Sequence, residues 1–141
     1  MIAGLGPVGV EAAKNIILQG VKKVTLWDNK SASWSDLGAQ YYLSESDVKQ
    51  SKNRASSSFQ QLKELNSYVN VELLESAELS ESVIAEHNVL LVTDTVNLFD
   101  GSEEKLLSMI SKEKIFSKNS TFRTKIAAMV FLLKTNFFVI L

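Results

Sequence analysis

The chain has 141 residues, a formal net charge of −1 and no cysteine, so its length suits one domain or part of a larger one. The near-neutral charge gives no sign of a nucleic-acid partner or a membrane surface. The lack of cysteine excludes disulfides, cysteine zinc sites and thioester chemistry on this chain, and it fits a reducing compartment. His87 is the only histidine, which excludes a histidine metal cluster; we expect an ordinary polar residue near a strand start.

A glycine loop opens the sequence. In MIAGLGPVGVEAAKNII, Gly4, Gly6 and Gly9 have G-x-G-x-x-G spacing. Such a loop turns tightly out of a strand, lets a pyrophosphate approach the backbone and packs the next helix close to the strand. The helix start offers N–H groups and a positive dipole end to an anion. The pattern alone leaves two interpretations open: a nucleotide site, or a turn that serves only packing.

The first strand is short. Only Met1, Ile2 and Ala3 precede the glycine loop, which is few for a central strand. We therefore expect a truncated N-terminal strand and a chain that begins inside a domain. No basic region followed by an apolar core is present, so this start is not a secretory signal.

Helical and strand patterns alternate along the rest of the chain. The spacing predicts a helix over 8–18 capped by Gly20, then a strand over 21–27 that ends at Asp28. A polar stretch, 29–43, is expected to form a loop or short turns. Further elements are predicted as helices over 51–66, 79–86 and 102–111 and strands over 69–74 and 89–93.

This order predicts an open, doubly wound α/β fold with a mostly parallel sheet. We assign 1–111 to this domain and 112–141 to an unmatched apolar tail. Two apolar runs in the tail are split by Lys134, Thr135 and Asn136, and neither reaches the roughly 20 residues that span a bilayer. The tail is either a buried strand or helix pair, or a segment foreign to the domain.

Asp28 strengthens the nucleotide interpretation. It ends a strand about 20 residues beyond the glycine loop, where a carboxylate can accept both ribose hydroxyls of a nucleotide. An ordinary aspartate at a strand end is the alternative.

Several segments carry a family resemblance. The stretches AKNIILQGVKKVTLWD, KNRA, ELNSYV and VLLVTDTVNL resemble the ubiquitin-activating enzymes of the ThiF/MoeB-type adenylating superfamily, over about residues 2–100. The nearest alternative is the small subunit of the SUMO-activating enzyme, because the stretch GAQ at 38–40 resembles that subunit. The resemblance implies a Rossmann-like, ThiF-type fold and a cytoplasmic or nuclear protein. It also implies one of two similar halves that together use ATP to adenylate the C-terminus of ubiquitin or a ubiquitin-like protein.

The loop after the second strand indicates which half. Active halves carry a pattern close to S-N-L-x-R-Q-F, whose arginine contacts the ATP phosphates. Here the chain has SDLGAQY over 35–41. Asp36 replaces the asparagine and Ala39 replaces the arginine, so a multi-donor cation is lost and a carboxylate is added. Gln40 keeps the glutamine of the pattern.

Other positions of an active half are retained. Lys52 falls 13 residues beyond Ala39, where active halves place a phosphate-binding lysine, and Asp94 lies near their metal-binding aspartate. From the residues alone, Lys52 with Arg54 equally suits an exposed basic start of a helix, and Asp94 suits a cap. The resulting candidates for a vestigial nucleotide site are Gly4, Gly6, Gly9, Asp28, Gln40, Lys52 and Asp94.

The hypothesis is an inactive adenylation half with no catalytic residue and no metal of its own. ATP and magnesium would bind at the active half, which would be its partner together with ubiquitin or a ubiquitin-like protein. We expect Trp34, Tyr41 and Tyr42 at an interface or in the core. A stand-alone nucleotide-binding module is the alternative, which ATP binding by the isolated chain would favour. A dinucleotide-dependent oxidoreductase is disfavoured, because no acid–base pair lies near the loop.

Overall fold

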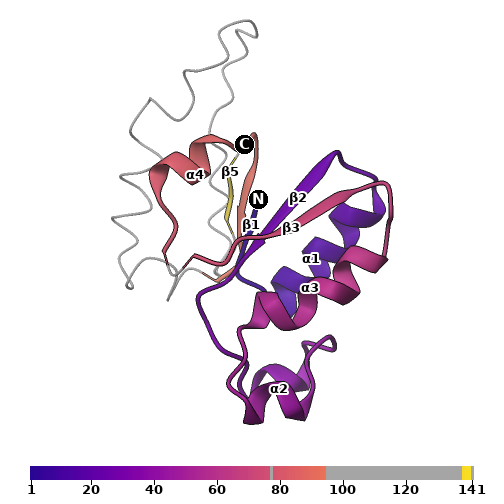
Figure 1. Cartoon of the computed structure of the whole chain (residues 1–141), viewed down its shortest axis with the longest axis vertical. Coiled ribbons are helices and arrows are strands. Elements are labelled where there is room, and N and C mark those ends of the chain that lie inside the picture. The colour runs from indigo at the N-terminus through magenta and orange to yellow at the C-terminus, as the bar shows by residue number, and fades with distance from the viewer. Residues whose placement is uncertain (77, 95–137, 141) are drawn as a thin grey trace, which may run out of the picture.

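The computed structural model describes residues 1–76, 78–94 and 138–140 (Figure 1). These residues form one sheet in the order β3-β2-β1-β4-β5. The first four strands run parallel, and β5 pairs antiparallel with β4. The strands are β1 (Ile2–Ala3), β2 (Lys23–Trp27), β3 (Asn70–Leu73), β4 (Leu90–Val92) and β5 (Phe138–Ile140). The predicted α/β fold with a mostly parallel, doubly wound sheet is confirmed.

The direction of winding reverses at β1. The chain adds β2 and β3 on one side of β1 and then places β4 on the other side, so that Ile2 lies opposite both Leu26 and Leu91. The expected short first strand is observed, with two residues in a central position. Open α/β sheets bind ligands at such a reversal, beside the carboxyl ends of the strands.

Four helices and one 3-10 turn connect the described strands. They are α1 (Pro7–Leu18), η1 (Asp36–Gly38), α2 (Glu45–Lys49), α3 (Arg54–Glu64) and α4 (Glu81–Ala85). The predicted α1 is confirmed, and Gly20 follows it at a φ of +76°. Helix α3 begins later than predicted because the side chain of Asn53 caps it, accepting hydrogen bonds from the backbone of Ala55 and Ser56.

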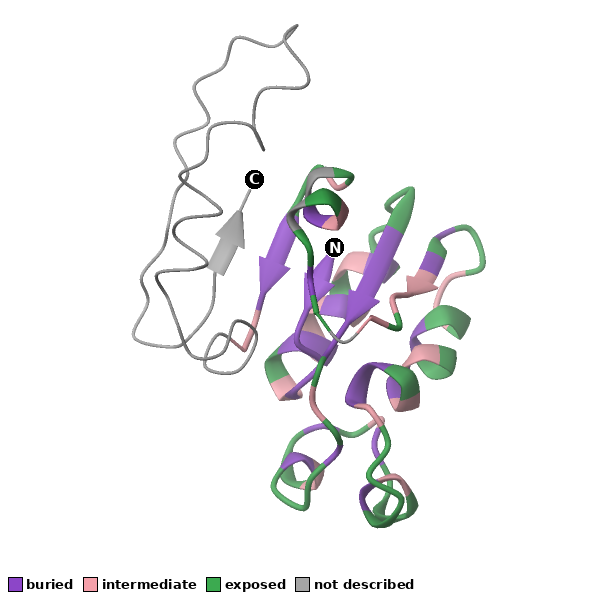
Figure 2. Cartoon of the chain, turned by 60° about the vertical axis from the view of Figure 1, so that its left-hand side comes forward, coloured by how far each residue is buried: buried purple, intermediate pink, exposed green. Residues whose placement is uncertain are grey.

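The sheet is covered on both faces, as Figure 2 shows by the buried strands at its centre. Helices α1 and α3 cover one face, where Ile2, Leu26 and Leu91 join their buried residues in one core cluster. The α4 side buries Trp27 and Val92 in a second cluster. Neighbouring residues of one strand thus enter different cores, as expected of a parallel strand buried on both faces.

Several expectations lie outside the described residues. These are the helix over 102–111, the domain boundary at 111 and all of the tail except 138–140. The tail residues that are described form β5, in which Ile140 lies opposite Leu90. Part of the segment assigned to an unmatched tail therefore extends the same sheet.

Candidate functional site

The glycine turn joins β1 to α1 at the reversal point of the sheet. Gly4 has a φ of +96°, a conformation that suits glycine, and its N–H donates to the carbonyl of Trp27 at 2.8 Å. A Cβ at Gly9 would overlap the carbonyl oxygen of Gly4, so the helix can pack this closely only with glycine there. Gly6 is the N-cap residue and has no side chain with which to cap α1. These glycines thus let the chain pass from β1 into α1 through a tight turn, as their G-x-G-x-x-G spacing predicts.

Asp28 lies beside this turn with its side chain fully buried. One oxygen, Oδ2, accepts from the backbone N–H of Leu5 at 2.6 Å and from Nε of Arg54 at 2.8 Å. The other, Oδ1, accepts from the backbone N–H of Lys30 at 2.8 Å and from Nη2 of Arg54 at 3.2 Å. Both oxygens are therefore engaged within the chain, and ribose hydroxyls would have to displace these donors.

Arg54 is the cation at the centre of the site. Its side chain is 5% exposed and bonds Asp28, Asp36 through Nη1 at 3.3 Å, and Asp94 through Nη2 at 3.1 Å. A Cβ on Gly6 would lie only 3.2 Å from Nη1 of Arg54, so the guanidinium lies against the glycine turn. Burial alone would lower the pKa of Arg54, but the negative charge of Asp28 and the bond to Asp94 outweigh it and raise this pKa.

Asp94 completes the ring of charges from the loop after β4. Its Oδ2 accepts from Nζ of Lys30 at 2.7 Å as well as from Arg54. Burial would raise the pKa of Asp94, but the hydrogen bonds from Lys30 and Arg54 outweigh it and hold the pKa below its ordinary value. Asp94 is thus an ion-pair partner of Lys30 and Arg54, and the residues that it would cap lie outside the described part of the chain.

Lys52 lies outside this ring. Its Nζ pairs with Asp47 at 3.0 Å, and its side chain is 47% exposed. The interpretation of Lys52 with Arg54 as an exposed basic helix start therefore holds for Lys52 and is wrong for Arg54. Ala39 is exposed at the end of η1 and offers no donor to the site.

Gln40 is fully buried beneath the glycine turn. Its Nε2 donates to the carbonyl of Leu5 at 3.2 Å and to Oγ of Ser58 at 2.8 Å, while its Oε1 accepts from the backbone N–H of Tyr42. All of these bonds are internal, so Gln40 fixes the turn against α3. Tyr42 is half-buried against the core, whereas Trp34 and Tyr41 are 60% and 56% exposed.

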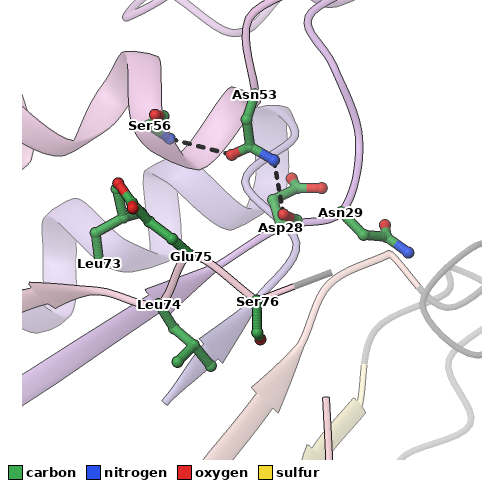
Figure 3. Close-up of a pocket in the computed structure, with 8 residues that line it drawn as sticks. All are labelled: Asp28, Asn29, Asn53, Ser56, Leu73, Leu74, Glu75 and Ser76. Carbon is green, nitrogen blue, oxygen red and sulfur yellow. Dashed lines mark hydrogen bonds between the residues drawn. The ribbon is translucent and has the colours of Figure 1, made fainter. Parts of the chain in front are cut away.

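A cleft of about 340 Å³ opens beside Asp28, between the start of α3 and the carboxyl ends of β2 and β3 (Figure 3). The side chain of Asn53 closes one wall, donating to the carbonyl of Asp28 at 2.7 Å. Among the described residues, its lining includes the acidic residues Asp28 and Glu75 and no lysine or arginine. This lining therefore supplies no positive charge for phosphates.

The structure thus brings together Asp28, Asp94 and the glycine turn, and leaves Lys52 elsewhere. Sequence reasoning missed the central role of Arg54 and the part of Lys30. One signal was present: Arg54 is the first residue of a helix, where the dipole disfavours a cation, so a nearby anion was needed to hold it.

Both cations at the site are already paired within the chain, and the group as a whole has a net charge of −1. Two cations, Lys30 and Arg54, face three carboxylates, Asp28, Asp36 and Asp94, in ion pairs or hydrogen bonds. In the described part of the chain, no group of histidine and acidic side chains is arranged to hold a metal ion. None of the described helices is long and apolar enough to cross a membrane.

Comparisons with known proteins agree with this architecture. Residues 1–101 match the ThiF family. Human ubiquitin-like modifier-activating enzyme 1 is 47% identical over 95 residues, which are 67% of this chain and 9% of that protein. Human ubiquitin-like modifier-activating enzyme 6 is 43% identical over 70 residues, or 50% of this chain and 7% of that protein. The chain thus spans about a tenth of the length of these curated relatives or less.

A solved structure gives a weaker likeness. The E. coli tRNA N6-threonylcarbamoyladenosine dehydratase in complex with ATP has a TM-score of 0.49 and 19% identity, and covers 60% of this chain and 34% of its own. The family assignment depends instead on the match over residues 1–101 and on the homologous enzymes. This chain belongs to the ThiF family and is homologous to the ubiquitin-like modifier-activating enzymes.

Proposed function

We propose that this chain is the non-catalytic half of an adenylation unit in a ubiquitin-activating type of enzyme. It supports an active half, which binds ATP and magnesium and adenylates the C-terminus of ubiquitin or a ubiquitin-like protein. The enzyme would work in the cytoplasm or the nucleus. The observation that carries the proposal is the glycine turn, whose neighbouring charges are already paired within the chain.

A triphosphate at this turn would need free positive charge. Arg54 has three carboxylate partners, and Lys30 is paired with Asp94. At the position where active halves have arginine, Ala39 has no charge. Because preorganised charge usually contributes more than any other effect to such catalysis, loss of these donors argues against turnover by this chain alone.

The test is ATP–pyrophosphate exchange with ubiquitin present. We expect no exchange above background from the purified chain, and exchange when an active half that lacks its own partner is added. Robust exchange by the chain alone would overturn the proposal. So would a failure of the chain to support any active half of the family, because the supporting role would then have no basis.

The stand-alone nucleotide-binding module is distinguished by calorimetry. The intact glycine turn favours this alternative, while the engaged oxygens of Asp28 oppose it. Tight ATP binding that is lost in Asp28→Ala would favour the alternative. The control variant is Glu45→Gln, whose exposed carboxylate pairs with Lys49 on α2, outside the site.

A further inference from the structure

Arg54 connects segments that the fold brings to one edge of the sheet from separate parts of the chain. Asp28 follows β2, Asp36 begins η1, and Asp94 follows β4, and one guanidinium bonds all three. A planar guanidinium with five N–H donors in a fixed fork can serve several carboxylates at once, which an ammonium does less well. The cation is buried, so its partners must hold it in place.

Two of these carboxylates, those of Asp28 and Asp36, also accept hydrogen bonds from backbone N–H groups. Asp28 also accepts from the N–H of Leu5, in the glycine turn. Asp36 also accepts from the N–H of Ser33 at 2.9 Å and from its Oγ at 2.7 Å. The turn that these bonds close contains the exposed Trp34. The guanidinium therefore fixes both the glycine turn and the Trp34 turn through a single intermediate side chain each.

The guanidinium also lies beside Gly6, where the lack of a side chain leaves space for another group. It is against Gly6, whose missing side chain makes the approach possible. In a nucleotide-binding turn, this room admits phosphate. Here it admits a side chain of the same protein, which supplies the contacts that a bound ligand would otherwise make between the loops.

We propose that Arg54 is an internal ligand: a positioning residue that takes the place of a bound nucleotide in ordering the carboxyl edge of the sheet. The glycine turn, the Trp34 turn and Asp94, which follows β4, then keep one arrangement without any nucleotide. This role rests on the proposed function and deepens it, since it explains how a half that binds no ATP keeps its loops ordered for a partner.

Hydrogen exchange of the full chain, followed by mass spectrometry of its peptides, tests this role. Three variants are compared: Arg54→Ala, Arg54→Lys and Lys52→Ala. Lys52 is the matched control, because it is also basic, lies two residues away and pairs only with Asp47 in the described structure. We expect Arg54→Ala to speed exchange at least ~10-fold in peptides that cover Leu5 and 30–36. Exchange in the second half of α3 should change much less.

Chemical rescue separates an internal ligand from a merely packed side chain. Guanidinium chloride at a few millimolar, far below denaturing concentrations, should restore slow exchange in Arg54→Ala. Sodium chloride at equal ionic strength should not. The exchange rate of Arg54→Lys should lie between those of the wild type and Arg54→Ala, because lysine keeps the positive charge but lacks the planar set of five N–H donors. Lys52→Ala should match wild type with or without guanidinium.

Three outcomes would overturn the inference. One is faster exchange spread evenly over all elements of Arg54→Ala, with no rescue by guanidinium. Another is unchanged exchange at Leu5 and 30–36. If Arg54→Ala does not fold, Arg54→Lys decides, and an exchange pattern equal to that of Lys52→Ala would refute the role. Protection of these peptides by ATP in the wild type would count against the proposed function instead, so the two failures are distinguishable.

Discussion

At the scale of single residues, the guanidinium of Arg54 connects the carboxylates of Asp28, Asp36 and Asp94 at the edge of the sheet. Asp28 was identified because it ends a strand beyond the glycine loop, and Asp94 because of the family resemblance. Both follow parallel strands, whose carboxyl ends lie at one edge of the sheet. Their partner could not be predicted so directly. Arg54 comes from a helix start, and only the packing of α3 against β2 and β3 brings its guanidinium to Gly6.

The low pKa of Asp94 gives the site a pH dependence. The ionised form stabilises the fold, so its contribution is full above about pH 5 and is lost as the pH falls through 3.8 towards the lower folded pKa. We expect Asp94→Asn to lower the free energy of unfolding at pH 7 by roughly 1 kcal/mol. The difference in the free energy of unfolding between variant and wild type should become smaller below about pH 4.

Urea unfolding between pH 7 and pH 3 measures this gap. The matched control is Glu45→Gln, because the exposed pair of Glu45 with Lys49 should contribute less than about 0.5 kcal/mol. A gap that stays constant down to pH 3 would contradict the role given to the ionised carboxylate.

At the scale of elements, strong periodicity predicted α1, α3 and the strands β2, β3 and β4, with ends that differ by up to three residues. The short α2 was not predicted. It has five residues and buries only Val48, so apolar spacing gives little signal, although Ser44 and Asp47 form a capping box. The pairing of β5 with β4 was not predictable either, because antiparallel addition of a distant strand depends on contacts rather than on local pattern.

The packing of α1 on the glycine turn gives a sharp test at this scale. Gly9→Ala would place a Cβ into the backbone of Gly4, which cannot move without shifting β1 against the helix. We expect a loss of at least ~2 kcal/mol in the free energy of unfolding, measured by urea denaturation. Gly38→Ala is the matched control: nothing lies within 4 Å of its Cβ position, so its cost should stay below about 1 kcal/mol. Equal costs for both variants would contradict the close approach.

At the scale of the whole molecule, the described surface has aromatic residues that the fold itself does not bury. Trp34 and Tyr41 are exposed on the segment between β2 and α2, on the side of the glycine turn. Tyr41 is held there by Glu11, which accepts from its hydroxyl at 2.5 Å, and by Lys14 over its ring. Aromatic side chains held in place and left exposed are typical of protein interfaces.

These residues lead to the last prediction, which concerns assembly. We expect the chain alone to self-associate and to become a one-to-one complex when an active half of the family is added. Light scattering after size exclusion measures both states.

If the Trp34 turn lies in that interface, Trp34→Ser should weaken the complex at least ~10-fold, which is about 1.4 kcal/mol or more. Tyr68→Ser is the matched control, because Tyr68 is 95% exposed but lies just before β3, at the amino-terminal end of that strand. A stable monomer that ignores the active half would refute the partnership. Equal weakening by both variants would place the interface away from the Trp34 turn.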